Sequence, residues 1–212
     1  MGDTEELAKK SGATIVTEMD MANDYAQKGF KVEGPNYGGT VHFDWGDVKI
    51  IPAWHTTANV PLGMATGLAL TIEGKLIYIA GDTGLFSDMK LVGRKQQIDL
   101  AFLPIGDYYT MGPDDAAYAA SLIDAKKVIP YHFNTFPPIK QDVNDFWKNV
   151  PENMKFIAEI DKPFELENTK LTKKGCIIFR TDNVKFFCIT VLLLFSPFLR
   201  QNKRDGPQRQ SN

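Results

Sequence analysis

The sequence is poor in the residue types that usually mark a metal or disulfide protein. Among its 212 residues are two cysteines, Cys176 and Cys188, and three histidines, His42, His55 and His132. Two isolated cysteines form neither a zinc motif nor a disulfide framework, which favours two reduced thiols. The formal net charge is only -2, so the composition carries no nucleic-acid-binding signature and we expect no nucleic-acid partner.

Targeting signals and long apolar stretches are also scarce. The chain opens with Met-Gly-Asp-Thr-Glu-Glu, so we expect no secretory signal and a cytoplasmic location. The main apolar run extends from Phe186 to Leu199 (residues 186–199), whereas a membrane-spanning helix needs about 20 residues. Pro197 interrupts this run, which favours a buried strand or a sticky extension. Its basic flank leaves a membrane anchor as the alternative.

Charge is unevenly distributed along the chain. Residues 1–166 carry 15 Lys and Arg against 23 Asp and Glu, a balance of -8. Residues 167–212 carry 9 against 3, a balance of +6. This change of sign predicts a boundary near Leu166, with a globular domain over 1–166 and a basic, partly apolar tail over 167–212.

Patterning within the first 166 residues predicts a mixed sheet covered by helices. Asp3 with Glu6 resembles a capping box, and Gly12 is typical of a helix end, so a short helix begins the chain. A strand at 13–17 and a helix at 20–27 follow. Four runs rich in β-branched or aromatic residues then predict a hairpin meander, at 40–44, 47–54, 65–72 and 75–80. Predicted helices and strands alternate thereafter, with helices near 85–94, 113–122 and 143–150 and strands at 98–105, 127–130 and 155–160. This order indicates an α/β (α+β) fold.

Three potential metal ligands directly follow predicted strands. They are His55, Asp82 in a Gly-Asp-Thr-Gly turn, and His132. Strand ends hold side chains rigidly while loops admit substrate, so together these residues indicate a metal site. Taken singly, each has a simpler explanation. A lone histidine at a strand end is usually structural, and the Gly-Asp-Thr-Gly sequence can form a turn without any further role. His42 lies within a predicted strand, and we interpret it as a sheet-face histidine.

A polar, glycine-rich loop at 104–113 follows a fully apolar predicted strand. Asp107 and Thr110 in this loop are candidate substrate-binding residues, and we add Asn134, two positions beyond His132. The alternative for the loop is an ordinary strand-to-helix connection in which Asp107 caps a local turn.

Five stretches of the sequence together carry a family resemblance. They are 52–55 (PAWH), 78–89 (YIAGDTGLFSDM), 103–107 (LPIGD), 110–113 (TMGP) and 129–137 (IPYHFNTFP). In these stretches the chain resembles the metal-dependent hydrolases of the metallo-β-lactamase superfamily, in the branch similar to the L-ascorbate-lactone hydrolase group. The resemblance extends from residue 2 to about 166. It implies an αββα sandwich, in which two sheets pack face to face with helices outside and a binuclear metal site lies at one edge.

The resemblance also implies roles for individual residues. His55 would be the third histidine of the first metal site, Asp82 would bridge both metals, and His132 would complete the second site. The metals would lower the pKa of a bridging water and polarise a carbonyl or phosphoryl oxygen. Zinc is the expected metal, with manganese or iron as alternatives that suit the same ligands. The expected substrate is a small molecule with an ester, lactone or phosphodiester bond.

The remaining ligands of such proteins come from a His-x-His-x-Asp-His motif that this sequence does not contain. Gly2-Asp3-Thr4 looks like the residues that follow the motif, so we expect a sandwich that is incomplete at the N-terminus. Metal binding should then be weak, since zinc sites generally use three protein ligands plus water. Three hypotheses follow: a hydrolase completed by upstream sequence or a partner chain, a non-catalytic remnant or binding module, and a membrane-tethered scaffold. Exposed sheet edges would favour self-association.

Overall fold

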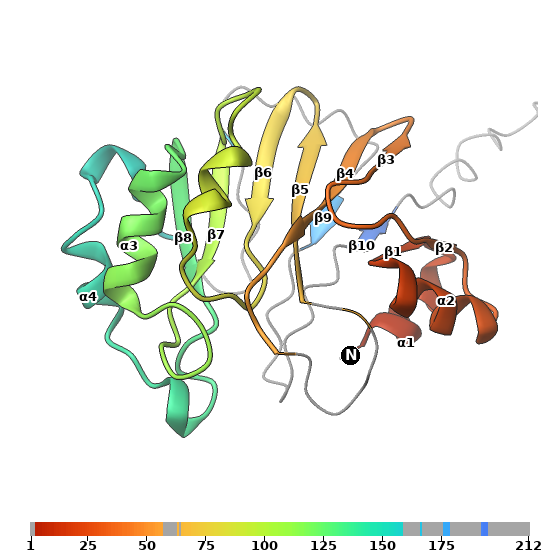
Figure 1. The fold of residues 1–212 in the computed structure, drawn as a ribbon, viewed down its shortest axis with the longest axis horizontal. Helices are drawn as coiled ribbons and strands as arrows, with labels where there is room; N and C mark the ends of the chain where they lie inside the picture. The colour runs from red at the N-terminus through yellow and green to blue at the C-terminus, as the bar shows by residue number, and fades with distance from the viewer. Residues whose placement is uncertain are drawn as a thin grey trace, which may run out of the picture.

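The computed structural model describes residues 3–56, 63, 65–158 and 166, together with the backbone of 176–178 and 192–194 (Figure 1). The N-terminal unit consists of two short helices beside a two-stranded parallel sheet. Its elements are α1 (Thr4–Ser11), β1 (Ile15–Val16), α2 (Met19–Gln27) and β2 (Val32–Glu33). These elements lie beyond the β3 edge of the main sheet in Figure 1. A small core of Ala8, Ile15 and Tyr25 holds them together.

The ends of the two N-terminal helices are only partly as predicted. Helix α1 ends at Gly12, whose φ of 68° is left-handed, as the sequence indicated. The predicted capping box does not form, because Asp3 makes no side-chain cap hydrogen bond and Glu6 pairs with Lys10 instead. Helix α2 is capped by Glu18, whose carboxylate accepts hydrogen bonds from the backbone N–H groups of residues 20 and 21.

A six-stranded sheet forms the centre of the molecule, in the order β3-β4-β5-β6-β7-β8. Its strands are β3 (Thr40–Phe43), β4 (Gly46–Pro52), β5 (Thr66–Ile72), β6 (Lys75–Ile79), β7 (Leu100–Pro104) and β8 (Lys127–Tyr131). Strands β3 to β6 are the predicted antiparallel meander, whereas β6, β7 and β8 pair in parallel. Strands β4, β6, β7 and β8 therefore run in one direction, and their carboxyl ends meet at the lower edge of the sheet in Figure 1.

Helices cover one face of this sheet. They are η1 (Ser87–Leu91), α3 (Pro113–Leu122) and α4 (Val143–Trp147), with short 3-10 turns η2 (Pro137–Ile139) and η3 (Glu152–Met154) in the connections. Helix α3 begins with proline at its first turn, as predicted, and buries four alanines, Ala116, Ala117, Ala119 and Ala120. Small side chains allow close approach of the helix to the sheet, and both contribute to one large apolar core.

Two predicted elements differ from the structure. The helix expected near 85–94 is reduced to the 3-10 turn η1, in a segment bounded on both sides by glycine, a poor helix former. The strand expected at 155–160 is reduced, over the residues described, to one isolated bridge between Lys155 and Val128 of β8. The side chains of Phe156 and Ala158 nevertheless pack on the sheet.

The second face of the sheet is also buried. Its core includes Val48, Leu70, Ile79, Phe102 and Ile129, against which residues of β1, of 156–158 and of position 166 pack. Burial on both faces is typical of a sheet within a layered sandwich. Besides the six-stranded sheet, the described residues form two two-stranded sheets, β1-β2 and β10-β9.

The tail contributes only short strands to the described structure. β9 (Cys176–Ile178) pairs antiparallel with β10 (Leu192–Leu194). Apart from the backbone of those three leucine positions, the apolar run 186–199 lies outside the described residues, so the anchor hypothesis and the boundary near Leu166 stay predictions. Among the residues that the structure describes, no helix combines the length and the apolar character needed to span a bilayer.

Candidate metal centre

The predicted ligands lie at one edge of the sheet because of the strand directions. His55 follows β4, Asp82 follows β6 and His132 follows β8, and these three strands run the same way. Asp107 follows β7 at the same edge. Residues 77 positions apart in the sequence are thus gathered where loops, rather than paired strands, surround them.

Asp82 and His132 form the centre of the candidate site. The Nε2 atom of His132 lies 3.8 Å from Oδ1 of Asp82. The His132 side chain is 6% exposed and that of Asp82 is 20% exposed, so the pair is largely removed from water. A carboxylate and an imidazole at this separation leave room for a cation between them.

Burial governs the protonation of both groups. Desolvation raises the pKa of Asp82, and the attraction that His132 and His55 exert on the carboxylate when they are protonated only partly opposes this rise. Desolvation also lowers the pKa of His132, against the attraction of Asp82 and with a further contribution from His55. The imidazole of His132 is therefore neutral at pH 7, which is the form that binds metals. A cation in the site would stabilise the Asp82 carboxylate and reverse its shift.

His55 is held in the tautomer of a metal ligand. Its Nδ1 lies 2.6 Å from the carbonyl oxygen of Thr56. Because a carbonyl only accepts hydrogen bonds, Nδ1 carries a proton, and in the neutral ring the lone pair is then on Nε2. Metal-binding histidines commonly donate their second ring N–H to a carbonyl in this way.

The chemical type and the location of these donors fit a divalent metal. Their number does not, because a metal site generally needs three protein ligands. Imidazole nitrogen and carboxylate oxygen suit zinc, manganese and iron. Within the described part of the chain, no three His, Cys, Asp or Glu side chains converge closely enough to enclose an ion. The structure therefore brings Asp82 and His132 together and leaves His55 near them without completing a three-ligand set.

Three of the five non-glycine residues with a positive φ among the described residues lie at the same edge, the other two being Glu73 and Asp124. Asp107, His132 and Asn134 have φ angles of 69°, 56° and 61°, in the left-handed region that side-chain-bearing residues seldom adopt. Such outliers persist where the surroundings impose them, and they cluster at functional sites. The surrounding hydrogen bonds are visible at Asn134, whose N–H donates to the carbonyl of Ile139 at 2.8 Å and whose Oδ1 accepts from the N–H of Gln141 at 2.8 Å.

Thr83 connects three loops of the site, a role that the sequence analysis did not identify. Its buried hydroxyl accepts from the N–H of Trp54 at 2.8 Å and donates to the carbonyl of Gly84 at 2.8 Å. Its own carbonyl accepts from the N–H of Met111 at 2.9 Å. The only sequence signal was its position beside Asp82. Through Thr83, the loops after β4, β6 and β7 are held in a fixed relation.

The hydroxyl of Tyr131 also stabilises the loop that carries Asp82. It donates to the carbonyl of Gly81 at 2.6 Å. Gly81 itself has a φ of 72°, and a β-carbon there would lie 2.3 Å from the carbonyl oxygen of Thr66. Glycine is therefore required immediately before Asp82, because any other residue would displace the strand end.

The predicted substrate-binding residues differ in their surroundings. Asp107 and Asn134 are exposed, whereas Thr110 is buried and its hydroxyl donates to the carbonyl of Met111 at 3.3 Å. Asp107 closes a local turn, since its N–H donates to the carbonyl of Met111 at 3.0 Å and its carbonyl accepts from the N–H of Thr110 at 3.1 Å. Their role in substrate binding stays a prediction.

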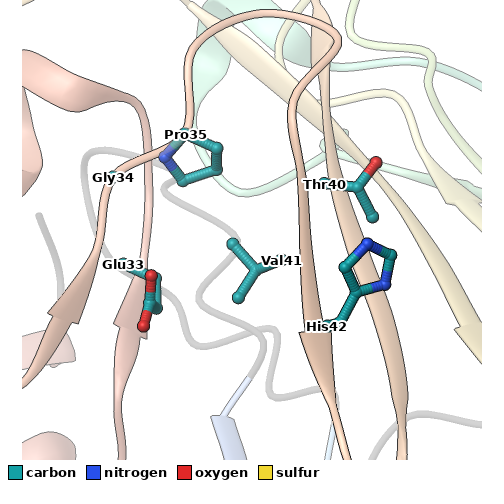
Figure 2. A pocket seen from close by; sticks show the side chains of 6 residues that line it. All are labelled: Glu33, Gly34, Pro35, Thr40, Val41 and His42. Atoms are coloured by element: carbon teal, nitrogen blue, oxygen red, sulfur yellow. The ribbon is translucent and has the colours of Figure 1, made fainter.

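His42 lies away from this edge, on β3. Its exposed ring contacts Asp47 across the β3-β4 pair, with 2.7 Å between Nδ1 and Oδ1. Figure 2 shows His42 beside an open pocket of about 490 Å³, between β2 and β3. The pocket is lined by Glu33, Gly34, Pro35, Thr40, Val41 and His42. His42 pairs with the start of β4, the end of that strand opposite His55, which agrees with its interpretation as a sheet-face residue.

Comparisons with known proteins agree with the fold. Residues 4–133 match the Beta-lactamase superfamily domain. The structure is similar to that of Igni18, described as a novel metallo hydrolase from the archaeon Ignicoccus hospitalis, with a TM-score of 0.69 and 35% identity over 74% of this chain and 70% of that one. The fold class is therefore that of the metallo-β-lactamases, as predicted.

Sequence relatives define the family more narrowly. The chain is 96% identical over 166 residues to a UPF0173 metal-dependent hydrolase of Ligilactobacillus salivarius, covering 78% of this chain and 76% of that protein. It is 50% identical over 158 residues to one of Geobacillus thermodenitrificans, covering 71% and 70%. The chain belongs to the UPF0173 metal-dependent hydrolase family of the beta-lactamase superfamily.

Proposed function

We propose that this protein hydrolyses an ester, lactone or phosphodiester bond of a small molecule, at a divalent metal held by Asp82 and His132 with His55 beside them. The observation that carries the proposal is the buried contact of 3.8 Å between His132 and Asp82 at the edge where the parallel strands end. The tautomer of His55 supports it, because Nε2 is left available. Zinc is the proposed metal, with manganese and iron as alternatives for the same donors.

The side chains around the candidate site are already arranged to bind a metal ion. When bound, a divalent metal supplies an activated water and polarises the substrate oxygen. Asp82 contributes a carboxylate whose burial makes a nearby positive charge favourable. His132 contributes a neutral imidazole, and its left-handed backbone directs it toward Asp82. Thr83 and Tyr131 hold the loops, so that little reorganisation accompanies binding.

One observation favours a second candidate function. The described residues contain no set of three converging ligands, and two ligands bind zinc weakly. A non-catalytic binding module of the same fold is therefore the alternative. It predicts no metal-dependent turnover of lactones, esters or phosphodiesters by the purified chain.

The test combines metal content, stability and turnover. The purified 212-residue chain is loaded with zinc or manganese, and bound metal is measured by inductively coupled plasma mass spectrometry. We expect bound metal, a rise in melting temperature when metal is added to the same protein, and turnover of at least one ester, lactone or phosphodiester. All three should be lost in Asp82→Asn and in His132→Asn, since asparagine tolerates the left-handed backbone at position 132.

His42→Asn is the matched control, because it removes an exposed histidine far from the site. Metal content and turnover should be unchanged in this variant. Metal binding that survives Asp82→Asn and His132→Asn would show that the ion lies elsewhere. Bound metal without turnover of any bond type would favour the binding module.

A further inference from the structure

Exposed aromatic side chains gather on the loops that carry the candidate ligands. Trp54 is 71% exposed beside His55, and Tyr108 and Tyr109 are 71% and 48% exposed on the loop after β7. Phe136 is half-buried on the loop after β8, four residues beyond His132. Large aromatic side chains left in contact with water at one edge of a domain indicate a binding surface.

Three of these rings lead from solvent to His132. The centroids of Tyr108 and Tyr109 are 4.7 Å apart in an edge-to-face contact. Tyr109 lies 6.1 Å from Phe136, and Phe136 lies 6.4 Å from the imidazole of His132. The rings of Tyr108, Tyr109 and Phe136, hereafter the aromatic wall, are thus continuous with a residue proposed to hold the metal.

A second ring pair belongs to the loops of the other two ligands. The indole of Trp54 stacks on Phe86, with centroids 6.2 Å apart and planes inclined by only 13°. Trp54 precedes His55, and Phe86 follows Asp82 by four residues. The Thr83 hydroxyl bonds the Trp54 backbone, so this pair is fixed relative to the site.

The same loops contain no basic residue that would bind a phosphate. Positions 53–64, 81–86, 105–112 and 131–139 include no lysine and no arginine, whereas they include Asp82 and Asp107. Recognition of a phosphodiester normally uses Arg or Lys. An uncharged ester or lactone with an apolar part therefore suits these loops better than a phosphate ester.

We propose that the aromatic wall binds a flat, apolar ring of the substrate, and that the protein hydrolyses aryl-substituted esters or lactones in preference to aliphatic or phosphorylated ones. This inference rests on the proposed function and names its substrate class. Offset or edge-to-face packing of a flat ring on Tyr109 and Phe136 strengthens binding about two- to tenfold beyond the effect of the apolar area that it buries. A saturated ring of similar size lacks this contribution, and a methyl group lacks most of the buried area as well.

The kinetic test uses esters with one leaving group. The zinc-loaded 212-residue chain is assayed with methyl phenylacetate, methyl cyclohexylacetate and methyl acetate. We expect the highest kcat/KM for methyl phenylacetate. Phe136→Leu and Tyr109→Ala should lower that value about tenfold and should lower the value for methyl acetate by a smaller factor. Tyr118→Ala, which removes a 61% exposed tyrosine on α3, should change neither value.

A binding test separates this inference from the proposed function. Saturation-transfer NMR compares phenylacetate with cyclohexylacetate, and it needs no turnover. Phenylacetate should give the stronger signal, and Tyr109→Ala should remove the difference. Binding of this kind without hydrolysis of any ester would refute the proposed activity and leave the aromatic wall as a binding site.

Two results would overturn the inference. One is an equal loss of kcat/KM for all three esters, with phenylacetate binding unchanged in the Tyr109→Ala variant. The other is a change of sedimentation coefficient in that variant, which would assign the rings to contact with a second copy of the chain. Thermal melting of each variant confirms that it is folded before either result is interpreted.

Discussion

The backbone oxygen of His132 lies 2.6 Å from the point where Gly106 would carry a β-carbon, and Ile139 closes the same space at 3.1 Å. The loop after β7 thus packs directly on the residue that follows β8. Gly106→Ala should displace His132, destabilise the fold by about 1–3 kcal/mol and weaken metal binding. Urea denaturation and metal titration measure the two effects.

Gly84→Ala is the matched control for that substitution. A β-carbon at Gly84 would meet only the oxygen of Trp54, at an ordinary 3.9 Å. Its free energy of unfolding should lie within about 0.5 kcal/mol of the parent. Equal stability of the Gly106→Ala and Gly84→Ala variants would mean that the Gly106–His132 contact does not position the ligand.

Removing the Thr83 hydroxyl should loosen the loop that carries His55. Thr83→Val keeps the shape but leaves the N–H of Trp54 without its acceptor, which costs about 1–3 kcal/mol. Thr83→Ser retains the hydroxyl and should restore most of the loss. Thermal unfolding gives the stability, and NMR of the His55 ring gives its tautomer. A fully stable Thr83→Val variant with an unchanged His55 spectrum would contradict the assignment.

Asp99 should stabilise the opposite end of the parallel strands. Its carboxylate accepts from Lys126 at 2.8 Å, from Lys75 at 3.4 Å and from the N–H of Leu76 at 2.9 Å. Asp99→Ala leaves a buried N–H unsatisfied and should cost about 2–3 kcal/mol. Asp99→Asn keeps an acceptor for Leu76 and should cost less. Metal affinity should not change in either variant, and a loss of affinity would count against this separation of roles.

The contribution of Asp99 to the free energy of unfolding should also depend on pH. Burial raises the pKa of Asp99, but the hydrogen bonds from Lys126 and from the N–H of Leu76 outweigh burial and lower it overall. The stabilisation is therefore complete above the ordinary value of 3.8 and is lost as the pH falls through the lowered pKa. Urea denaturation from pH 3 to pH 7 should show the parent and Asp99→Asn converging at the acidic end.

In the metal-free protein, ionised Asp82 should destabilise the fold, whereas ionised Asp99 stabilises it. Burial raises its pKa above 3.8, so folding incurs a penalty that is absent below 3.8 and grows as the pH rises through the raised value. Metal-free Asp82→Asn should therefore melt at a higher temperature than the parent at pH 7, with a smaller gain near pH 4. A variant that melts lower at pH 7 would contradict this account.

That the candidate ligands share one edge of the sheet could be predicted from the sequence, because their positions depend on strand ends. The apolar run before Asp82 and the Val-Ile-Pro before His132 identify strands, and residues just beyond parallel strands share an edge. The 3.8 Å contact could not be predicted in the same way, since it depends on the packing of Gly106 against His132 across two strands.

Interactions that depend on one side-chain hydrogen bond were harder to predict. The pattern of Asp3 and Glu6 indicated a capping box, yet the nearby Lys10 captures Glu6, and Glu18 caps the next helix although it is not among the preferred capping residues. The role of Thr83 has no sequence signal beyond its neighbours. Two of its partners, Trp54 and Met111, lie 29 and 28 residues away in other loops, and the third, Gly84, is adjacent. The aromatic wall likewise joins residues of separate loops.

The common direction of β4, β6, β7 and β8 has a consequence for the history of this family. Residues that would hold a metal directly follow paired strands, where a substitution disturbs the sheet. Tyr108, Tyr109 and Phe136 lie farther along the loops, and the opposite end of the sheet, which contains Asp99, does not depend on them. Selection can therefore exchange the ring-bearing positions one at a time while the scaffold is inherited unchanged. Proteins with this fold can therefore change their substrate preference while they keep the residues that would hold a metal.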